Sequence, residues 1–215
     1  KGALEKELEA SGAASLFYYI EMPLVPVLAY MEKNGVCLDT AALKETSQHF
    51  TTRMNQIEQE IYQLAGKEFN VSSPKQVGEI LFDELKLDSR VKKSKSGNYS
   101  TSEEVLQSIK DKHPVVGLII NYRELKKLIS TYITALPTYI NPQTGKIHTT
   151  YNQTTTATGR LSSSNPNLQN LPIRSERGQL IRSAVIPDDG CMFLSADYSQ
   201  IELRLMAHFS QDPHL

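Results

Sequence analysis

Two carboxylates near the end of the sequence have a spacing that suits metal binding. Asp197 ends a short, mostly apolar run, residues 191–197, that predicts a buried strand, and a helix is predicted from Ile201 onward. A divalent cation such as Mg²⁺ needs hard oxygen ligands and usually takes only one or two carboxylates. Glu202, early in that helix, could reach the same cleft. The spacing leaves a second interpretation open, in which Asp197 caps the helix.

Basic residues gather in two segments of a chain whose formal net charge is only −1. Segment 90–98 contains no acidic residue, and segment 160–182 contains only Glu176. A neutral protein with such local concentrations of cations can still bind a polyanion, so nucleic acid is a candidate partner. The cations concerned are Arg90, Lys92, Lys93, Lys95, Arg160, Arg174, Arg177 and Arg182.

Helical periodicity dominates the part of the chain that precedes these residues. Apolar side chains recur every three, four or seven positions over residues 43–64, which predicts a helix of about 25 residues. Asp39 or Thr40 would cap this helix and Gly66 would end it. We expect residues 38–136 to form one elongated helical part.

Start signals mark the other helices of this part. Pro74 and Pro114 each suit the first position of a helix, where the missing N–H costs nothing. The sequence TSEE at 101–104 predicts a capping box with Thr101 as the cap. Residues 86–100 are polar and have little to bury, so we expect a mobile loop there.

The remaining segments predict a mixed α/β part built from residues 21–37 and 137–215. Asn34-Gly35 is a helix stop. Alternating β-branched residues predict a strand near 147–153, and the aperiodic segment 154–172 predicts an extended loop. A short helix is expected near 179–185. The overall expectation is an α+β, mostly helical fold in which the helical part is inserted into the mixed part.

Composition excludes some classes of protein. Hydrophobic residues make up 40% and charged residues 22%, which is typical of globular proteins. The two cysteines, Cys37 and Cys191, lie too far apart in sequence to suggest a disulfide framework or a zinc site. We find no apolar run that approaches the ~20 residues of a membrane helix, so we expect no transmembrane span.

Four segments resemble one known family. Residues 197–204 (DYSQIELR) resemble motif A of the family A DNA polymerases, the bacterial DNA polymerase I group. Residues 156–163 (TATGRLSS) and 165–172 (NPNLQNLP) are similar to two upstream blocks of that family. Residues 20–28 (IEMPLVPVL) resemble the start of its polymerase domain. The similarity covers nearly the whole chain and keeps the family's order.

The resemblance implies a domain organisation. Residues 1–20 would be the tail of a preceding exonuclease-like domain, and 21–37 would lead into the palm. The thumb would occupy 38–136, and 137–215 would be the first part of the palm, ending just after motif A. The implied architecture is an elongated helical thumb inserted in an incomplete mixed α/β palm.

The resemblance also implies roles at the reaction centre. Asp197 would be a catalytic residue that binds both Mg²⁺ ions, with the Tyr198 main-chain carbonyl as a further ligand. Glu202 would exclude ribonucleotides beside the sugar 2′ position, and Gln200 would line the same cleft. The substrates would be a dNTP and a primer–template duplex.

The implied contacts with duplex DNA are spread along the chain. Lysines of the thumb tip and cations of the long thumb helix would contact phosphates without reading bases. Arg160 would reach universal acceptors in the minor groove, and neighbouring amides would bond sugars and base edges. The candidate DNA-binding residues are Lys92, Lys93, Lys95, Arg123, Lys127, Arg160, Asn167, Gln169, Asn170 and Arg174.

Two elements that the family needs do not occur in the sequence: a second catalytic aspartate and the fingers helix. Without them, we expect this fragment alone to be inactive. The resemblance implies that the intact parent is a cytoplasmic bacterial polymerase without an obligate protein partner. One alternative is a non-catalytic duplex-DNA-binding module. Another is a metal-dependent nuclease that uses Asp197 and Glu202, although such an enzyme should cluster further acids nearby.

Overall fold

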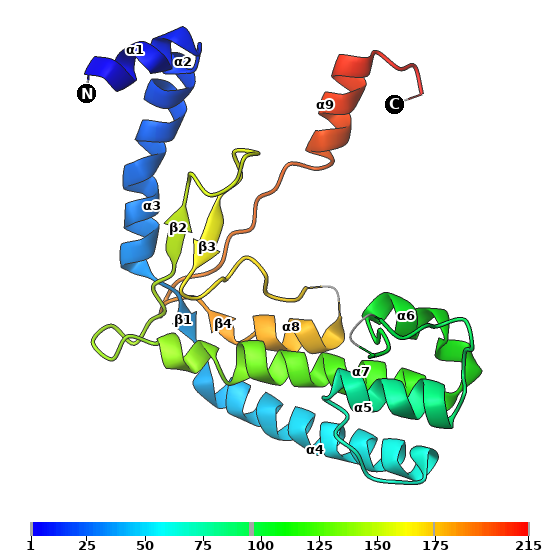
Figure 1. Ribbon diagram of the computed structural model, residues 1–215. Coiled ribbons are helices and arrows are strands. Elements are labelled where there is room, and N and C mark those ends of the chain that lie inside the picture. Colours follow the sequence, from blue (N-terminus) through cyan, green and yellow to red (C-terminus); the bar gives the residue numbers. More distant parts are fainter. Residues whose placement is uncertain (1, 95–96, 174, 215) are drawn as a thin grey trace.

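The computed structural model describes residues 2–94, 97–173 and 175–214. The first helix is α1 (Gly2–Ala10), and a break follows it at Gly12, whose φ is +73°. A continuous helical rod then runs from residue 14 to residue 34 (Figure 1). It ends at Gly35, whose φ of +66° confirms the predicted stop. The successive parts of the rod are α2 (Ala14–Leu16), the π-helical turn η1 (Phe17–Glu21) and α3 (Met22–Asn34).

The rod bears on the expectation that the chain contains no transmembrane span. By length and composition, residues 14–34 are long and apolar enough to cross a membrane. Polar residues interrupt the apolar runs of the rod, so its mean hydropathy is high although no single uninterrupted run is long. One such helix is weak evidence for a membrane span. Two of its carboxylates contact the folded body, since Glu21 accepts a bond from the Gln153 side chain at 2.9 Å and Glu32 accepts one from the Tyr151 N–H at 2.6 Å.

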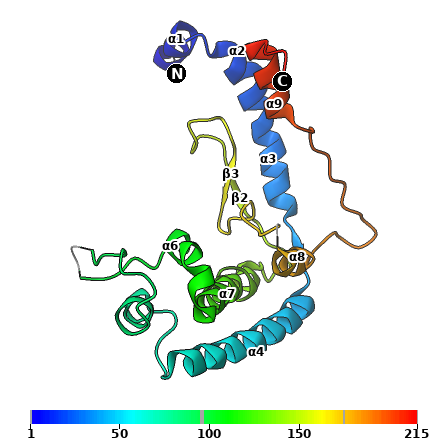
Figure 2. The same ribbon diagram turned by 90° about the vertical axis from the view of Figure 1, so that its right-hand side faces the viewer.

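The helical region confirms the predicted α-rich part. Its two long helices, α4 and α7, lie side by side (Figures 1 and 2), and shorter turns surround them. Its elements are α4 (Thr40–Ala65), α5 (Pro74–Gly78), η2 (Glu79–Glu84), α6 (Glu103–Ser108), η3 (Lys110–Lys112), α7 (Pro114–Leu128), η4 (Ile129–Ile133) and η5 (Leu136–Tyr139).

Side-chain caps fix where these helices start. Asp39, one of the two residues expected to cap α4, accepts a bond from the Ala42 N–H at 2.9 Å. Pro74 stands at the start of α5 as predicted, and Ser73 caps this helix. The cap of α6 is Ser102, whose hydroxyl accepts from Val105, so the assignment to Thr101 was wrong. Thr101 is instead buried, and its hydroxyl accepts a hydrogen bond from the Arg123 guanidinium.

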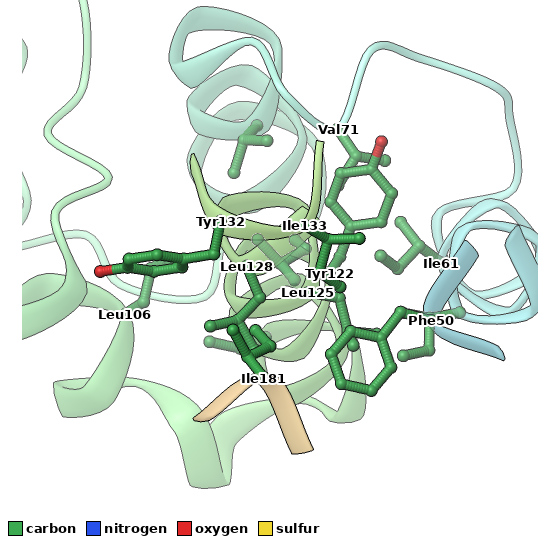
Figure 3. Packing of buried hydrophobic residues seen from close by; sticks show 14 of the residues in the cluster. Phe50, Ile61, Val71, Leu106, Tyr122, Leu125, Leu128, Tyr132, Ile133 and Ile181 are labelled. Atoms are coloured by element: carbon green, nitrogen blue, oxygen red, sulfur yellow. The ribbon is translucent and has the colours of Figure 1, made fainter. Parts of the chain in front are cut away.

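The core lies between α4, α7 and α8 (Glu176–Arg182). Figure 3 shows Phe50 and Ile61 of α4 beside Leu125 of α7, with Ile181 of α8 against Leu128. All five side chains are buried. Burying a side chain of this size stabilises a fold by about 1.5–3 kcal/mol, so α8 is anchored by packing although it is short.

Two small antiparallel sheets join distant parts of the chain. β1 (Cys37–Leu38) pairs with β4 (Val185–Ile186), so the chain leaves for the helical region after β1 and returns to pair with it. β2 (Thr150–Asn152) pairs with β3 (Ser162–Ser164), with Thr150 opposite Ser164. The sheet formed by β2 and β3 lies beside α3 (Figures 1 and 2). The fold is therefore mostly helical with small sheets, as expected.

Three local predictions for the last part of the chain need correction. Residues 191–197 form no strand and are exposed, because no described strand pairs with them to form a ladder. β3 forms inside the predicted loop. Ser162–Ser164 pairs with β2, but its three serines lack the apolar alternation from which a strand is predicted. α8 starts at Glu176, earlier than predicted, because Ser175 caps it. The final helix, α9 (Ile201–Ser210), is confirmed.

Candidate nucleic-acid interface

Asp197 lies in the extended, exposed segment that leads to α9 (Figure 1). Gln200 precedes the helix in a left-handed conformation, with φ of +53°, and no side chain caps α9. The interpretation of Asp197 as a helix cap was therefore wrong. Arg204 stabilises the start of α9 instead, since its Nε donates to the Ser199 carbonyl at 3.0 Å. Asp197, Tyr198 and Gln200 are exposed.

Glu202 and Arg160 are brought together by the fold. The Arg160 Nη2 donates to the Glu202 carboxylate at 2.7 Å, although 42 positions separate the two residues. Arg160 projects from the loop between β2 and β3, where the Thr156 hydroxyl donates to the Arg160 carbonyl at 2.6 Å. The sequence placed both residues at a site, but it did not predict that they would contact each other.

The described residues supply only part of a metal-ligand set. Over residues 2–94, 97–173 and 175–214, no three His, Cys, Asp or Glu side chains are grouped so that they could hold a metal ion. Asp197 makes no side-chain bond to any residue that the structure describes, whereas Glu202 is paired with Arg160. One carboxylate does not form a two-metal centre. The nuclease interpretation has no cluster of acids to support it within this part of the chain.

The amides of the loop after β3 mainly build the loop itself. The Asn167 side-chain oxygen accepts bonds from the N–H groups of Gln169 at 3.0 Å and Asn170 at 3.2 Å. The Gln169 side chain donates to the Leu161 carbonyl at 3.3 Å. The Asn170 side chain is exposed, and the Asn170 main-chain carbonyl accepts a bond from the Tyr132 hydroxyl at 2.5 Å. The loop therefore presents Asn170 on a frame that Asn167 organises.

Two buried hydroxyls under this loop were missed by sequence reasoning. Ser163 donates to the Asn167 side-chain oxygen at 3.2 Å and accepts from the Leu168 N–H at 3.1 Å. Thr149 donates to the carbonyls of Ser164 and Pro166, at 3.1 and 2.7 Å. Both residues stand among other serines and threonines in the sequence, so no local signal distinguishes them.

Arg123 and Lys127 of α7 differ in their surroundings. The Arg123 guanidinium is half-buried, donating to the Thr101 carbonyl and, at 3.1 Å, to the Thr101 hydroxyl. Burial lowers the pKa of Arg123 below its ordinary value. Lys127 is exposed at the rim of a 380 Å³ cleft between α6 and α7. Arg123 thus fastens the segment that precedes α6 to α7, and Lys127 is the cation of the two that is open to a phosphate.

The cations of the predicted thumb tip are also unequal. Lys93 pairs with Asp83 at 3.0 Å and lies 4.9 Å above the centre of the Tyr99 ring. Hydrogen bonds from Tyr99 and Lys93 lower the pKa of Asp83 below its usual range. Lys92 is exposed, and in the described part of the loop it makes no ion pair. Lys92 is therefore the more available cation.

Lys95 and Arg174, two further residues predicted to bind DNA, lie outside the described residues.

Comparisons with known proteins decide the family. The model of DNA polymerase family A matches residues 40–215, which is most of the chain. The chain belongs to DNA polymerase family A. Polymerases of this family use Mg²⁺, so the carboxylate of Asp197 lies in a chain whose family needs such ligands.

Curated relatives include two bacterial enzymes. The chain is 49% identical over 216 residues to DNA polymerase I of Chloroflexus aurantiacus, covering 99% of this chain and 23% of that protein. It is 50% identical over 200 residues to the thermostable DNA polymerase I of Thermus aquaticus, covering 93% of this chain and 24% of that protein. The chain thus spans about a quarter of the length of these family A relatives.

A solved structure supports the same fold. It is the polymerase domain of Pol1 from M. smegmatis, in complex with DNA primer-template and dNTP. The TM-score is 0.86 at 40% sequence identity, and the match covers 99% of this chain and 37% of that one. The family A fold therefore extends over the whole described chain, including the rod and α9.

Proposed function

We propose that this chain is the thumb and the first part of the palm of a DNA-directed DNA polymerase, and that it grips primer–template duplex through phosphates and the minor groove. The observation that carries the proposal is the similarity, over 99% of the chain, to a polymerase domain bound to DNA primer-template and dNTP. The bacterial relatives support a cytoplasmic location. The domain boundaries after residues 20, 37 and 136 belong to the same proposal.

The exposed cations give the grip its chemistry. Lys92 at the tip and Lys127 on α7 are exposed, so their ammonium groups can approach phosphates without first breaking an ion pair in the described chain. Arg160 and Asn170 extend from the loops around β3, and both can donate to the acceptors of a minor groove. Gln169 and Asn167 position these loops and contact DNA only secondarily.

The palm segment would supply one part of the reaction centre. Asp197 is the free carboxylate that could ligate Mg²⁺, and the adjacent Tyr198 carbonyl could add a ligand. When bound, Mg²⁺ neutralises the charge of a triphosphate. Glu202 and Gln200 at the start of α9 would lie beside the sugar of the incoming nucleotide. The other ligands must come from the two-thirds of the polymerase domain that this chain does not cover.

The test of duplex binding is an affinity series for a fluorescent primer–template duplex between about 50 and 200 mM salt. We expect a log–log slope equivalent to about three or more released counterions. Replacing Lys92 by Gln should weaken binding and reduce the slope by about one. Absence of binding at about 50 mM salt would contradict the proposed grip.

Arg123 and Lys127 form a matched pair for the same assay. Lys127→Gln should weaken duplex binding and leave the free energy of unfolding unchanged, because its side chain is exposed. Arg123→Gln should lower the free energy of unfolding by about 1–3 kcal/mol, because Thr101 loses its buried donors. Equal effects of both variants on both measurements would contradict this division of roles.

The chain alone should not incorporate nucleotides, because no three His, Cys, Asp or Glu side chains among its described residues are grouped so that they could hold a metal ion. The measurement is primer extension by highly purified chain with dNTP and Mg²⁺. Incorporation that Asp197→Ala abolishes would overturn this part of the proposal. A chain that binds duplex but extends nothing would also fit a non-catalytic duplex-binding module, which the missing ligands favour for the isolated polypeptide.

A further inference from the structure

The ion pair between Arg160 and Glu202 joins two residues that the proposed function uses separately. Their side chains are 75% and 79% exposed, and the guanidinium lies 2.7 Å from the carboxylate. Arg160 comes from the β2–β3 loop and Glu202 from the first turn of α9. Both elements are held by their own internal bonds, at Thr156 and at Arg204. The pair is therefore a contact between two independently built surfaces.

The carboxylate does not need Arg160 as its only source of stabilisation. Glu202 lies in the first turn of α9, where the helix dipole favours a negative charge. An exposed pair of this kind contributes little free energy, because water solvates both charges well. The contact is thus easily exchanged for a competing partner of either residue.

Duplex DNA is such a competitor for the arginine. A minor-groove acceptor would take the same guanidinium N–H donors that now face Glu202, and the phosphates flanking the groove would repel the carboxylate. From this, resting on the proposed duplex grip, we infer that Glu202 masks Arg160 in the DNA-free protein and that the duplex displaces it. Binding of the duplex then releases the Glu202 carboxylate at the start of α9, next to the segment that carries Asp197.

This exchange assigns Glu202 a role in DNA binding beyond contact with a sugar. The mask lowers the affinity for duplex by the strength of one exposed ion pair, which corresponds to about a two- to five-fold effect. It also couples two events, since the free carboxylate is presented when the duplex occupies Arg160.

The test is a double-mutant cycle on the complete 215-residue chain. The dissociation constant for a fluorescent primer–template duplex is measured for the wild type, Glu202→Gln, Arg160→Gln and the double variant, at one low salt concentration. Circular dichroism checks that all four are folded, which is expected because both side chains are exposed. We expect Glu202→Gln to tighten binding about two- to five-fold and to have no effect when Arg160 is already replaced.

The other outcomes separate the two proposals. An equal gain from Glu202→Gln in both backgrounds would show a general loss of negative charge and overturn the mask, while duplex binding itself stands. An Arg160→Gln variant that binds as tightly as the wild type would also overturn it. If neither the wild type nor Glu202→Gln binds duplex, the proposed grip fails and the mask fails with it.

Discussion

Arg177 of α8 and Glu124 of α7 form an ion pair across the contact between their helices, with 2.7 Å between the guanidinium and the carboxylate. Their side chains are only 29% and 39% exposed. The two residues are 53 positions apart, so the pair joins the last part of the chain to the helical body. It acts beside the buried Ile181, which anchors the same helix by packing.

Replacing Arg177 by Gln should lower the free energy of unfolding by about 0.5–1 kcal/mol, because a partly shielded pair is worth about that much. Urea unfolding followed by circular dichroism measures the change. Arg182→Gln is the matched control, since Arg182 lies on the same helix, is exposed and has no ion pair among the described residues. Equal losses in the two variants would mean that the Glu124 contact contributes nothing specific.

The loop after β3 approaches α8 at a glycine. A Cβ on Gly178 would lie 2.7 Å from the Pro172 Cβ and 2.9 Å from the Pro172 carbonyl oxygen. Such overpacking against backbone costs about 1–3 kcal/mol, so Gly178→Ala should destabilise the chain by that amount.

Gly117→Ala provides the control for this substitution. In α7 the added Cβ would meet nothing closer than the Lys110 Cε at 4.0 Å. Alanine favours helix over glycine by about 1 kcal/mol, so this variant should be more stable than the wild type. Thermal unfolding of both variants decides the matter, and shifts of the same sign would contradict the close approach at Pro172.

Local signals in the sequence predicted the helices well. The side chains of Asp39 and Ser73 cap α4 and α5 through bonds to residues three positions away, and such contacts are visible as short motifs. The stop at Gly35 is equally local, since its positive φ suits glycine. Periodicity of apolar residues predicted the buried face of α4 for the same reason.

Contacts between distant residues could not be predicted in the same way. Nothing near Arg160 in the sequence indicates Glu202, and nothing near Arg123 indicates that Thr101 would occupy its guanidinium. The predicted strand at 191–197 failed because a strand needs a partner, which apolar composition cannot supply. The roles of the candidate site residues depend on such contacts, and they remain predictions.

Thr149 should stabilise the loop after β3, which carries Asn167, Gln169 and Asn170. It is buried, and its hydroxyl donates to two carbonyl oxygens, those of Ser164 and Pro166. Thr149→Val keeps the shape but leaves both acceptors without this donor, which should cost about 1–3 kcal/mol. Thr155→Val, at an exposed position of the β2–β3 loop, should change the stability little. Chemical denaturation of the two variants gives the comparison, and a neutral Thr149→Val would rule out this role.

Asp88, which lies just before the basic segment 90–98, should make the stability of the chain depend on pH. It is buried and accepts bonds from Arg90 at 2.9 Å and from Lys112 at 2.6 Å. The side-chain bonds from these two cations hold its pKa well below the usual range. An unfolded aspartate titrates near pH 3.9. The native state therefore binds the proton less readily, and the stabilisation is complete above about pH 4 and is lost as the pH falls further.

Urea unfolding of the wild type and Asp88→Asn between pH 7 and pH 3 tests this dependence. The variant should be less stable at pH 7, and the difference should shrink as the pH falls below about 4, because the wild type then loses the charge that the variant lacks. Asp111→Asn is the control: Asp111 is exposed on the neighbouring turn η3 and makes no ion pair in the part of the chain that the structure describes. A difference between wild type and Asp88→Asn that stays constant down to pH 3 would show that the carboxylate acts through its shape and hydrogen bonds alone.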